Sequence, residues 1–234
     1  LLGLPPPKGR EDAMPHIAPK SAEDLRDVKK VLEMSEAAMG FIPNSTLTMA
    51  HKPQLSLAFS LLAAVTYGAD LKGLLAFYGD AIPEPSNPEQ SLTPEQIQLL
   101  AFAVSLSAGC RYCQAHTSHR LVEAGANQEK LSAIADYEAS AAFTPGEKAL
   151  LALAFAAGQN PNEATSAHFT ALKDHFSEEQ IVQAVGVVSL FGFLNRWNDT
   201  MATTLEKAPM AFAKASLDVF SWAEGKHGPS EPGA

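Results

Sequence analysis

Cysteine is nearly absent from this chain: only two of its 234 residues are cysteines, and both lie in one motif. Such a low content excludes a disulfide-stapled framework, which uses several cysteine pairs. The chain also lacks a basic excess, because its formal net charge is −9. Nucleic acids and anionic membrane surfaces both select basic faces, so neither is an expected partner. The cysteine pair indicates redox or metal chemistry in a reducing compartment, and we expect a cytoplasmic protein.

Long hydrophobic runs are missing as well. The longest uncharged stretches are residues 53–69 and 180–195. Both are shorter than the roughly 20 residues that a membrane span needs, and both are predicted to be buried helices. No signal-peptide pattern is recognised either.

No alternating strand pattern occurs, and helix-forming residues dominate between the two ends. We therefore predict one all-α domain over residues 21–222, with flexible segments at 1–20 and 223–234, where proline and glycine gather. The proline-rich stretch 82–92 separates an N-terminal part from the rest. Helices are predicted at 22–36, 45–51, 53–66, 69–80, 94–107, 110–124, 128–136, 145–158, 162–174, 178–192, 194–207 and 209–223.

Two of the predicted helices begin alike. Thr93-Pro94-Glu95-Gln96 and Thr144-Pro145-Gly146-Glu147 both place a threonine N-cap before proline, with a glutamine or glutamate at the third helical position. Similar apolar runs follow both. This similarity leaves open an internal helical repeat, beside the simpler interpretation that two capped, buried helices resemble each other.

The cysteines form the motif Cys110-Arg111-Tyr112-Cys113, and His116 follows. Gly109 ends an apolar run and is the kind of residue that lets the chain turn into a new helix. Both thiols would then lie in a first helical turn, where free N–H groups and the helix dipole favour thiolate. Three residues are close to one turn, so the sulfurs share a face and can bond.

Two other interpretations of the motif compete. Cys110, Cys113, His116 and His119 have the spacing of a metal-binding set. On a continuous helix, however, the first and last would lie about 13 Å apart on opposite faces, too far for one tetrahedral ion. The remaining alternative is two small buried residues placed near each other by chance. We favour the redox dithiol and expect no metal or cofactor.

The residues around the motif resemble the alkylhydroperoxidase D-like branch of the carboxymuconolactone decarboxylase superfamily. The resemblance is carried by six stretches: Gly40-Phe41-Ile42-Pro43-Asn44, Ala50-His51-Lys52-Pro53, Leu92-Thr93-Pro94-Glu95, Ser107-Ala108-Gly109-Cys110-Arg111-Tyr112-Cys113-Gln114-Ala115-His116-Thr117, Phe143-Thr144-Pro145 and Leu190-Phe191-Gly192-Phe193-Leu194-Asn195-Arg196. It implies an all-α alkylhydroperoxidase D-like fold, a homo-oligomer, and a thiol-dependent peroxidase that takes a hydroperoxide substrate and an unnamed thiol reductant.

The resemblance also implies roles. Cys113 would attack the peroxide and Cys110 would resolve the sulfenic acid. The family's proton-carrying glutamate falls at Gln98, so Glu95, one turn earlier, is expected to replace it. The family's histidine falls at Thr117, and His116 is expected to act one place early.

Two further functions stay open. The chain can be a non-catalytic helical oligomer that senses oxidants through a reversible disulfide. It can also be a lactone enzyme like carboxymuconolactone decarboxylase. That chemistry does not depend on a cysteine pair, so Cys110 and Cys113 count against it.

Overall fold

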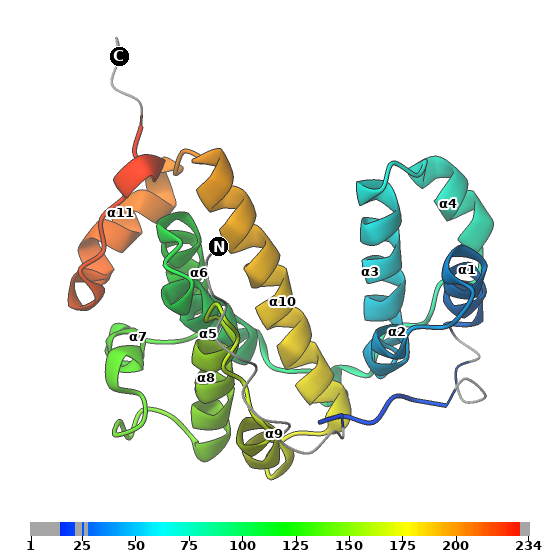
Figure 1. Cartoon of the computed structure of the whole chain (residues 1–234). Helices are drawn as coiled ribbons and strands as arrows, with labels where there is room; N and C mark the ends of the chain where they lie inside the picture. The colour runs from blue at the N-terminus through cyan, green and yellow to red at the C-terminus, as the bar shows by residue number, and fades with distance from the viewer. Residues whose placement is uncertain (1–14, 22–24, 26–27, 230–234) are drawn as a thin grey trace, which may run out of the picture.

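The computed structural model describes residues 15–21, 25 and 28–229. Every regular element in those residues is helical, which confirms the predicted all-α class (Figure 1). The helices are α1 (Lys29–Met39), α2 (Asn44–Met49), α3 (Pro53–Thr66), α4 (Leu71–Tyr78), α5 (Pro94–Ser107), α6 (Arg111–Glu123), α7 (Gln128–Ala133), α8 (Pro145–Ala157), α9 (Ser166–Lys173), α10 (Glu178–Met201) and α11 (Lys207–Ser216). Short 3-10 turns lie at η3 (Pro88–Gln90), η4 (Ile134–Asp136), η5 (Asp218–Phe220) and η6 (Gly225–His227).

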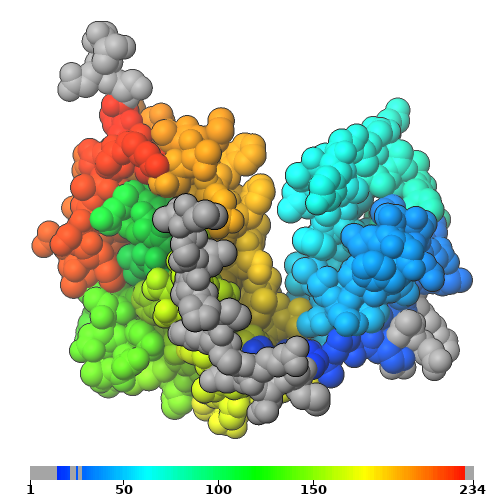
Figure 2. Space-filling model, viewed as in Figure 1, coloured from blue at the N-terminus to red at the C-terminus, as the bar shows by residue number. Residues whose placement is uncertain are grey.

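The helices form two groups, each with its own buried cluster. Helices α1–α4, here the N-terminal lobe, enclose Val31, Leu57 and Tyr78. Helices α5–α11, here the C-terminal lobe, enclose a larger cluster. Figure 2 shows a gap between the lobes, with α3 and α10 on its two sides (Figure 1). Near the base of the gap Lys52 Nζ lies 3.4 Å from Glu179 Oε1, and this ion pair ties the lobes together.

Helix α5 is the central helix of the C-terminal lobe. Residues 99–105 are almost fully inaccessible, and α6, α8 and α10 all pack against this helix. Thr93 and Thr144 form the predicted capping boxes at the starts of α5 and α8. In each box the threonine side chain and the third helical side chain bond each other's backbone N–H, which satisfies donors that would otherwise be unpaired. The two similar starts thus begin two helices that pack on one another.

Helix α10 corrects one prediction. Two helices, at 178–192 and 194–207, are predicted here, whereas the structure has a single helix of 24 residues. A lone Gly192 costs only about 1 kcal/mol in a helix interior. Burial of Ile181, Ala184 and Val188 against the core outweighs that cost. Helix α11 begins at Lys207, with Pro209 in its first turn, where the missing N–H has no helical acceptor.

Parts of both predicted flexible ends are packed. The His16 ring stacks on Phe169 with centroids 4.2 Å apart, and Ile17 is buried. At the other end, His227 is 1% exposed. His16 and Ile17 therefore pack on the C-terminal lobe, as does His227, whereas the Lys20 N–H donates to the Leu47 carbonyl of the N-terminal lobe at 3.3 Å. Residues 1–14 and 230–234 fall outside the described residues. Within the described part of the chain, no helix is long and apolar enough to span a membrane.

Candidate redox-active dithiol site

The cysteine pair lies where α5 turns into α6. Gly109 has a φ of +74°, a left-handed conformation that glycine adopts without strain, and it follows the end of α5. Cys110 is the N-cap of α6 and Cys113 is its third residue. Both are free thiols, and they are only 1% and 3% exposed. The predicted position of the pair in a first helical turn is confirmed.

Hydrogen bonding between the two thiols shifts their pKa values in opposite directions. It lowers the pKa of Cys110, although burial opposes the shift, and the backbone N–H groups of Cys113 and Tyr112 lower it further. The same hydrogen bond raises the pKa of Cys113, and burial adds to that rise. When the pair loses a proton, the thiolate is therefore favoured at Cys110, and the remaining proton stays on Cys113. The resemblance implies attack by Cys113, and that order requires the proton to cross to Cys110.

Helix α10 contributes Asn198 to the site. Its Nδ2 donates to Cys113 Sγ at 3.6 Å and to the Leu194 carbonyl at 3.0 Å. The contact with sulfur favours thiolate at Cys113 and acts against the thiol–thiol hydrogen bond. Thr117, the position of the family's histidine, is buried and donates its hydroxyl to the Cys113 carbonyl at 2.7 Å. Thr117 thus supports the helix and offers no acid–base group.

Glu206 is a site residue that sequence reasoning missed. It is the N-cap of α11, and its carboxylate lies 2.7 Å from His116 Nε2 and accepts the Tyr112 hydroxyl at 3.0 Å. Burial, together with the Glu206 carboxylate, raises the pKa of Tyr112 to about 12. Burial would raise the pKa of Glu206, but its own backbone N–H, His116 and Tyr112 together lower it. Ninety positions separate Glu206 from His116, so no local pattern predicted the contact.

Glu95 does not join this cluster, which corrects the predicted site. It lies in the first turn of α5, about 18 Å along the helix axis from Ser107, which is next to the turn that carries Cys110. Its carboxylate pairs with Lys130 Nζ at 2.6 Å, and Lys130 also pairs with Glu147 at 2.6 Å. Glu95 therefore anchors α5 to α7 and α8. Gln98 is half-buried, and its Oε1 has no hydrogen-bond partner.

The C-terminal segment brings a second unpredicted group to the same region. The Nδ1–H of His227 donates to the Thr203 carbonyl at 2.8 Å, and its Nε2 lies 3.6 Å from Asp199 Oδ1. The His227 ring centroid is 5.8 Å from that of Tyr112. The negative charge of Asp199 raises the pKa of both thiols. Acidic and basic groups thus surround the dithiol on several elements.

The four-residue metal set does not assemble. His119 Nε2 lies 3.8 Å from Glu123 and its ring contacts Phe212, away from the cysteines. Among the residues that the structure describes, no group of three or more His, Cys, Asp or Glu side chains is placed to hold a metal ion.

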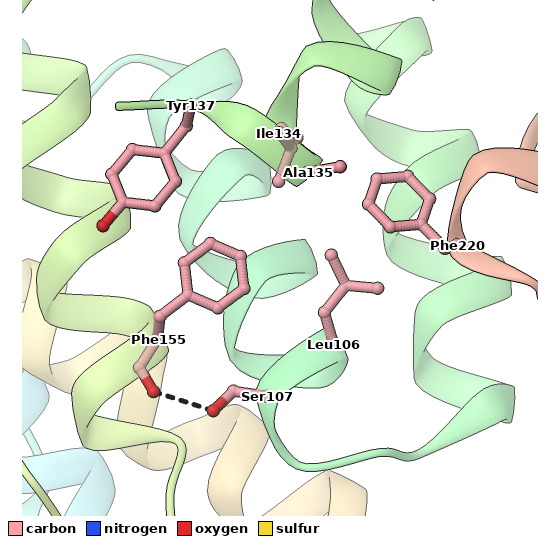
Figure 3. Close-up of a pocket in the computed structure, with 7 residues that line it drawn as sticks. All are labelled: Leu106, Ser107, Ile134, Ala135, Tyr137, Phe155 and Phe220. Atoms are coloured by element: carbon pink, nitrogen blue, oxygen red, sulfur yellow. Dashed lines mark hydrogen bonds between the residues drawn. The ribbon is translucent and has the colours of Figure 1, made fainter. Parts of the chain in front are cut away.

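An open pocket of about 430 Å³ lies elsewhere in the C-terminal lobe (Figure 3). Its lining is mostly apolar, with Tyr137 and Phe155 stacked at 5.5 Å between centroids. Ser107 lines the pocket but donates its hydroxyl to the Phe155 carbonyl at 2.7 Å. The complete lining is Leu106, Ser107, Ile134, Ala135, Tyr137, Phe155 and Phe220. Neither cysteine is part of it, so this pocket is distinct from the dithiol site.

Comparison with known proteins finds a family model that matches the region of the cysteine motif. Residues 71–156 match the model of the carboxymuconolactone decarboxylase family. The uncharacterized protein YnjA of Escherichia coli K12 is 27% identical over 110 residues, which are 47% of this chain and 60% of that protein. An uncharacterized peroxidase-related protein from Silicibacter sp. TM1040 is 17% identical over 88% of this chain and 96% of its own, with a TM-score of 0.46.

The match to the debrominase Bmp8 covers a larger share of both chains than the match to YnjA does. It is 29% identical and has a TM-score of 0.50, covering 87% of this chain and 97% of its own. A second structure of Bmp8, with one cysteine replaced by alanine, holds 2,3,4-tribromopyrrole and is 28% identical with a TM-score of 0.50. That match covers 89% of this chain and 98% of the debrominase.

Proposed function

We propose that this chain is a thiol-dependent peroxidase that reduces hydroperoxides, and the match of residues 71–156 to the carboxymuconolactone decarboxylase family supports this proposal. The observation that carries the proposal is the reduced pair Cys110 and Cys113, both held at the start of α6. Two thiols in one turn can supply two electrons and close an intramolecular disulfide. The lowered pKa of Cys110 gives the pair thiolate character.

The reaction has two balanced steps. A thiolate attacks one oxygen of R–O–O–H, so that the O–O bond breaks, the sulfur becomes sulfenic acid and the alkoxide leaves as the alcohol after protonation. The second thiol then attacks the sulfenic sulfur and releases water, and a disulfide remains. Overall, dithiol and hydroperoxide give disulfide, alcohol and water. An external dithiol must reduce the disulfide before the next turnover.

Protons can reach the site through Glu206. Its carboxylate joins His116 and Tyr112, and Tyr112 lies between the two cysteines in sequence. A carboxylate and an imidazole 2.7 Å apart form a conventional acid–base pair. In this proposal Glu206 has the proton-carrying role that was predicted for Glu95. His116 keeps its predicted role.

Reductive debromination is the second candidate, and the 29% identity with a debrominase over most of both chains supports it. The dithiol would again supply two electrons. A thiolate takes the bromine from the aromatic carbon, which gains a proton, and the second thiol closes the disulfide as bromide leaves. Dithiol and aryl bromide thus give disulfide, the debrominated ring and hydrogen bromide.

One set of assays separates the candidates. Free thiols are counted before and after one equivalent of hydrogen peroxide, cumene hydroperoxide or 2,3,4-tribromopyrrole, and turnover is then followed with a small dithiol present. We expect loss of two thiols per chain and repeated consumption of hydroperoxide. Loss of thiols with a single turnover per chain would instead identify a redox sensor. Activity on a lactone that persists when both cysteines are serine would identify the lactone enzyme.

A further inference from the structure

We propose that Asn195 is a substrate-binding residue, whose side-chain amide holds the two oxygens of the hydroperoxide beside Cys113. The inference rests on the proposed peroxidase function and deepens it, because it assigns the polar contact that seats the substrate. Asn195 lies outside the cysteine motif, and although it falls in one of the stretches that carry the resemblance, the resemblance implies no role for it.

The first observation is that the Asn195 amide is buried and unsatisfied. The residue is 4% exposed, and neither Nδ2 nor Oδ1 has a hydrogen-bond partner. Buried amides are almost always bonded in native proteins, because stripping water from an unpaired polar group is costly. Leucine would fill the same space without that cost. An unpaired donor and an unpaired acceptor on one buried side chain therefore require an explanation, and a bound substrate would satisfy both.

The second observation is the position of Asn195 on α10. It lies one turn before Asn198, whose Nδ2 donates to Cys113 Sγ at 3.6 Å. Residues three apart on a helix are neighbours, with about 5–6 Å between their Cβ atoms. The Asn195 amide is therefore about one helical turn from the contact between α10 and the Cys113 thiol.

The third observation is where the unsatisfied groups gather. Within the described residues, the buried side-chain atoms without a partner belong to Gln98, Asn195 and His227. They come from α5, α10 and η6, and each of these elements packs against α6, the helix that begins at the cysteines. Other buried polar groups on these helices are bonded, as the Ser105 hydroxyl is to the Ala101 carbonyl at 2.7 Å. The unsatisfied groups are thus confined to the surroundings of the dithiol helix.

The chemistry of an amide matches that of a hydroperoxide. The group R–O–O–H has one O–H donor and acceptor lone pairs on both oxygens. A primary amide has two N–H donors and one carbonyl acceptor. Nδ2 can donate to the oxygen that leaves, where negative charge develops, while Oδ1 accepts from the terminal O–H. An aryl bromide offers the amide neither a comparable donor nor a comparable acceptor at the bond that breaks.

The test compares Asn195→Leu and Asn195→Ala with the wild type. Both variants should lower kcat/KM for cumene hydroperoxide by about tenfold, the loss expected for one or two hydrogen bonds. The melting temperature of Asn195→Leu should stay the same or rise, because the substitution removes an unpaired polar group. The rate at which iodoacetamide labels the thiols should not change. The inert product alcohol should inhibit both variants more weakly than the wild type.

The matched control is Ser105→Ala, which removes a buried but satisfied polar group on α5. It should lower the melting temperature and leave kcat/KM unchanged. An active wild type with equally active Asn195 variants would overturn the role of Asn195 and leave the peroxidase function standing. Variants that lose thiol labelling and stability together would show a structural role, which also overturns it. A wild type that consumes no hydroperoxide would overturn both.

Discussion

The two buried thiols are hydrogen-bonded to each other, and individual neighbouring residues influence which of them carries the proton. The thiols differ by position, because Cys110 caps α6 and receives backbone N–H groups, whereas Cys113 receives the Asn198 amide. The cap position favours thiolate at Cys110, while the family's order of roles gives the attack to Cys113. Both can hold at different stages of one catalytic cycle, because transfer of the proton from Cys113 to Cys110 moves the thiolate to Cys113.

The single-cysteine variants test that cycle. At limiting reagent, iodoacetamide should label Cys110 first in the wild type, with a pH midpoint below that of an ordinary cysteine thiol, because its pKa is lowered. Cys113→Ser should abolish hydroperoxide consumption, because the attacking thiol is lost. Cys110→Ser should allow one turnover that stops at sulfenic acid, which a sulfenic-acid trap detects by mass spectrometry. Trapped sulfenic acid on Cys110 in an active Cys113→Ser protein would reverse the roles.

Replacing Glu206 by glutamine tests the acid–base cluster. The carboxylate charge helps to hold the pKa of Tyr112 at about 12, so Glu206→Gln should let tyrosinate form at lower pH. Ultraviolet titration shows this shift, with Tyr112→Phe identifying which tyrosine signal moves. Hydroperoxide turnover should fall in Glu206→Gln and in His116→Ala alike. A shifted tyrosine titration with undiminished turnover would mean that the cluster is structural.

At the scale of the elements, Lys130 joins the helices that surround the site. Its Nζ is 2.6 Å from both Glu95 and Glu147, so α5, α7 and α8 meet at one cation. Burial opposes the shift, but hydrogen bonds from Lys130 and from the Thr144 backbone lower the pKa of Glu147. A lowered carboxyl pKa stabilises the fold above the unfolded-state pKa. That contribution disappears as the pH falls through the folded-state value.

Replacing Glu147 or Glu95 by glutamine should therefore change the stability of the fold and leave the rate of hydroperoxide reduction unchanged. Glu147→Gln should lower the free energy of unfolding at neutral pH, and its difference from the wild type should vanish below the lowered pKa. Glu95 is more exposed, so Glu95→Gln should cost at most about 1 kcal/mol. Urea denaturation from neutral to acid pH measures both. Neither variant should change hydroperoxide turnover, and a turnover loss in Glu95→Gln would restore its predicted catalytic role.

At the scale of the whole molecule, α3 and α10 lie on the two sides of the gap between the lobes (Figure 1), and both helices carry exposed apolar side chains. Phe59 and Leu62 on α3 are 43% and 48% exposed, and Phe193 and Trp197 on α10 are 47% and 56% exposed. Patches of this kind on soluble proteins mark interaction sites. We propose that a second copy of this chain covers them, because the same two faces on each copy can pair with one another. This proposal assigns an interface to the homo-oligomer that the sequence predicts.

Charged substitutions on that surface should release monomers. Phe193→Glu and Leu62→Glu each put a carboxylate where apolar contact is expected, so light scattering should move to the 24.9 kDa monomer mass. Val219→Glu is the matched control, since Val219 is 54% exposed but lies in η5, outside the gap. It should keep the mass of the wild type. A wild type of monomer mass at micromolar concentration would contradict the proposal.

The sequence by itself determined the helical class, the capped starts of α5 and α8, and the position of two thiols in the first turn of α6. Each of these depends on residues within one or two turns of one another, where propensity, capping and helical period act. Only the tertiary structure decided which distant groups meet the thiols. Asn198 of α10 contacts Cys113, while Glu206 at the start of α11 reaches His116, and Glu95 pairs instead with Lys130. Contacts between segments roughly ninety residues apart depend on how whole helices pack, and no local pattern encodes them.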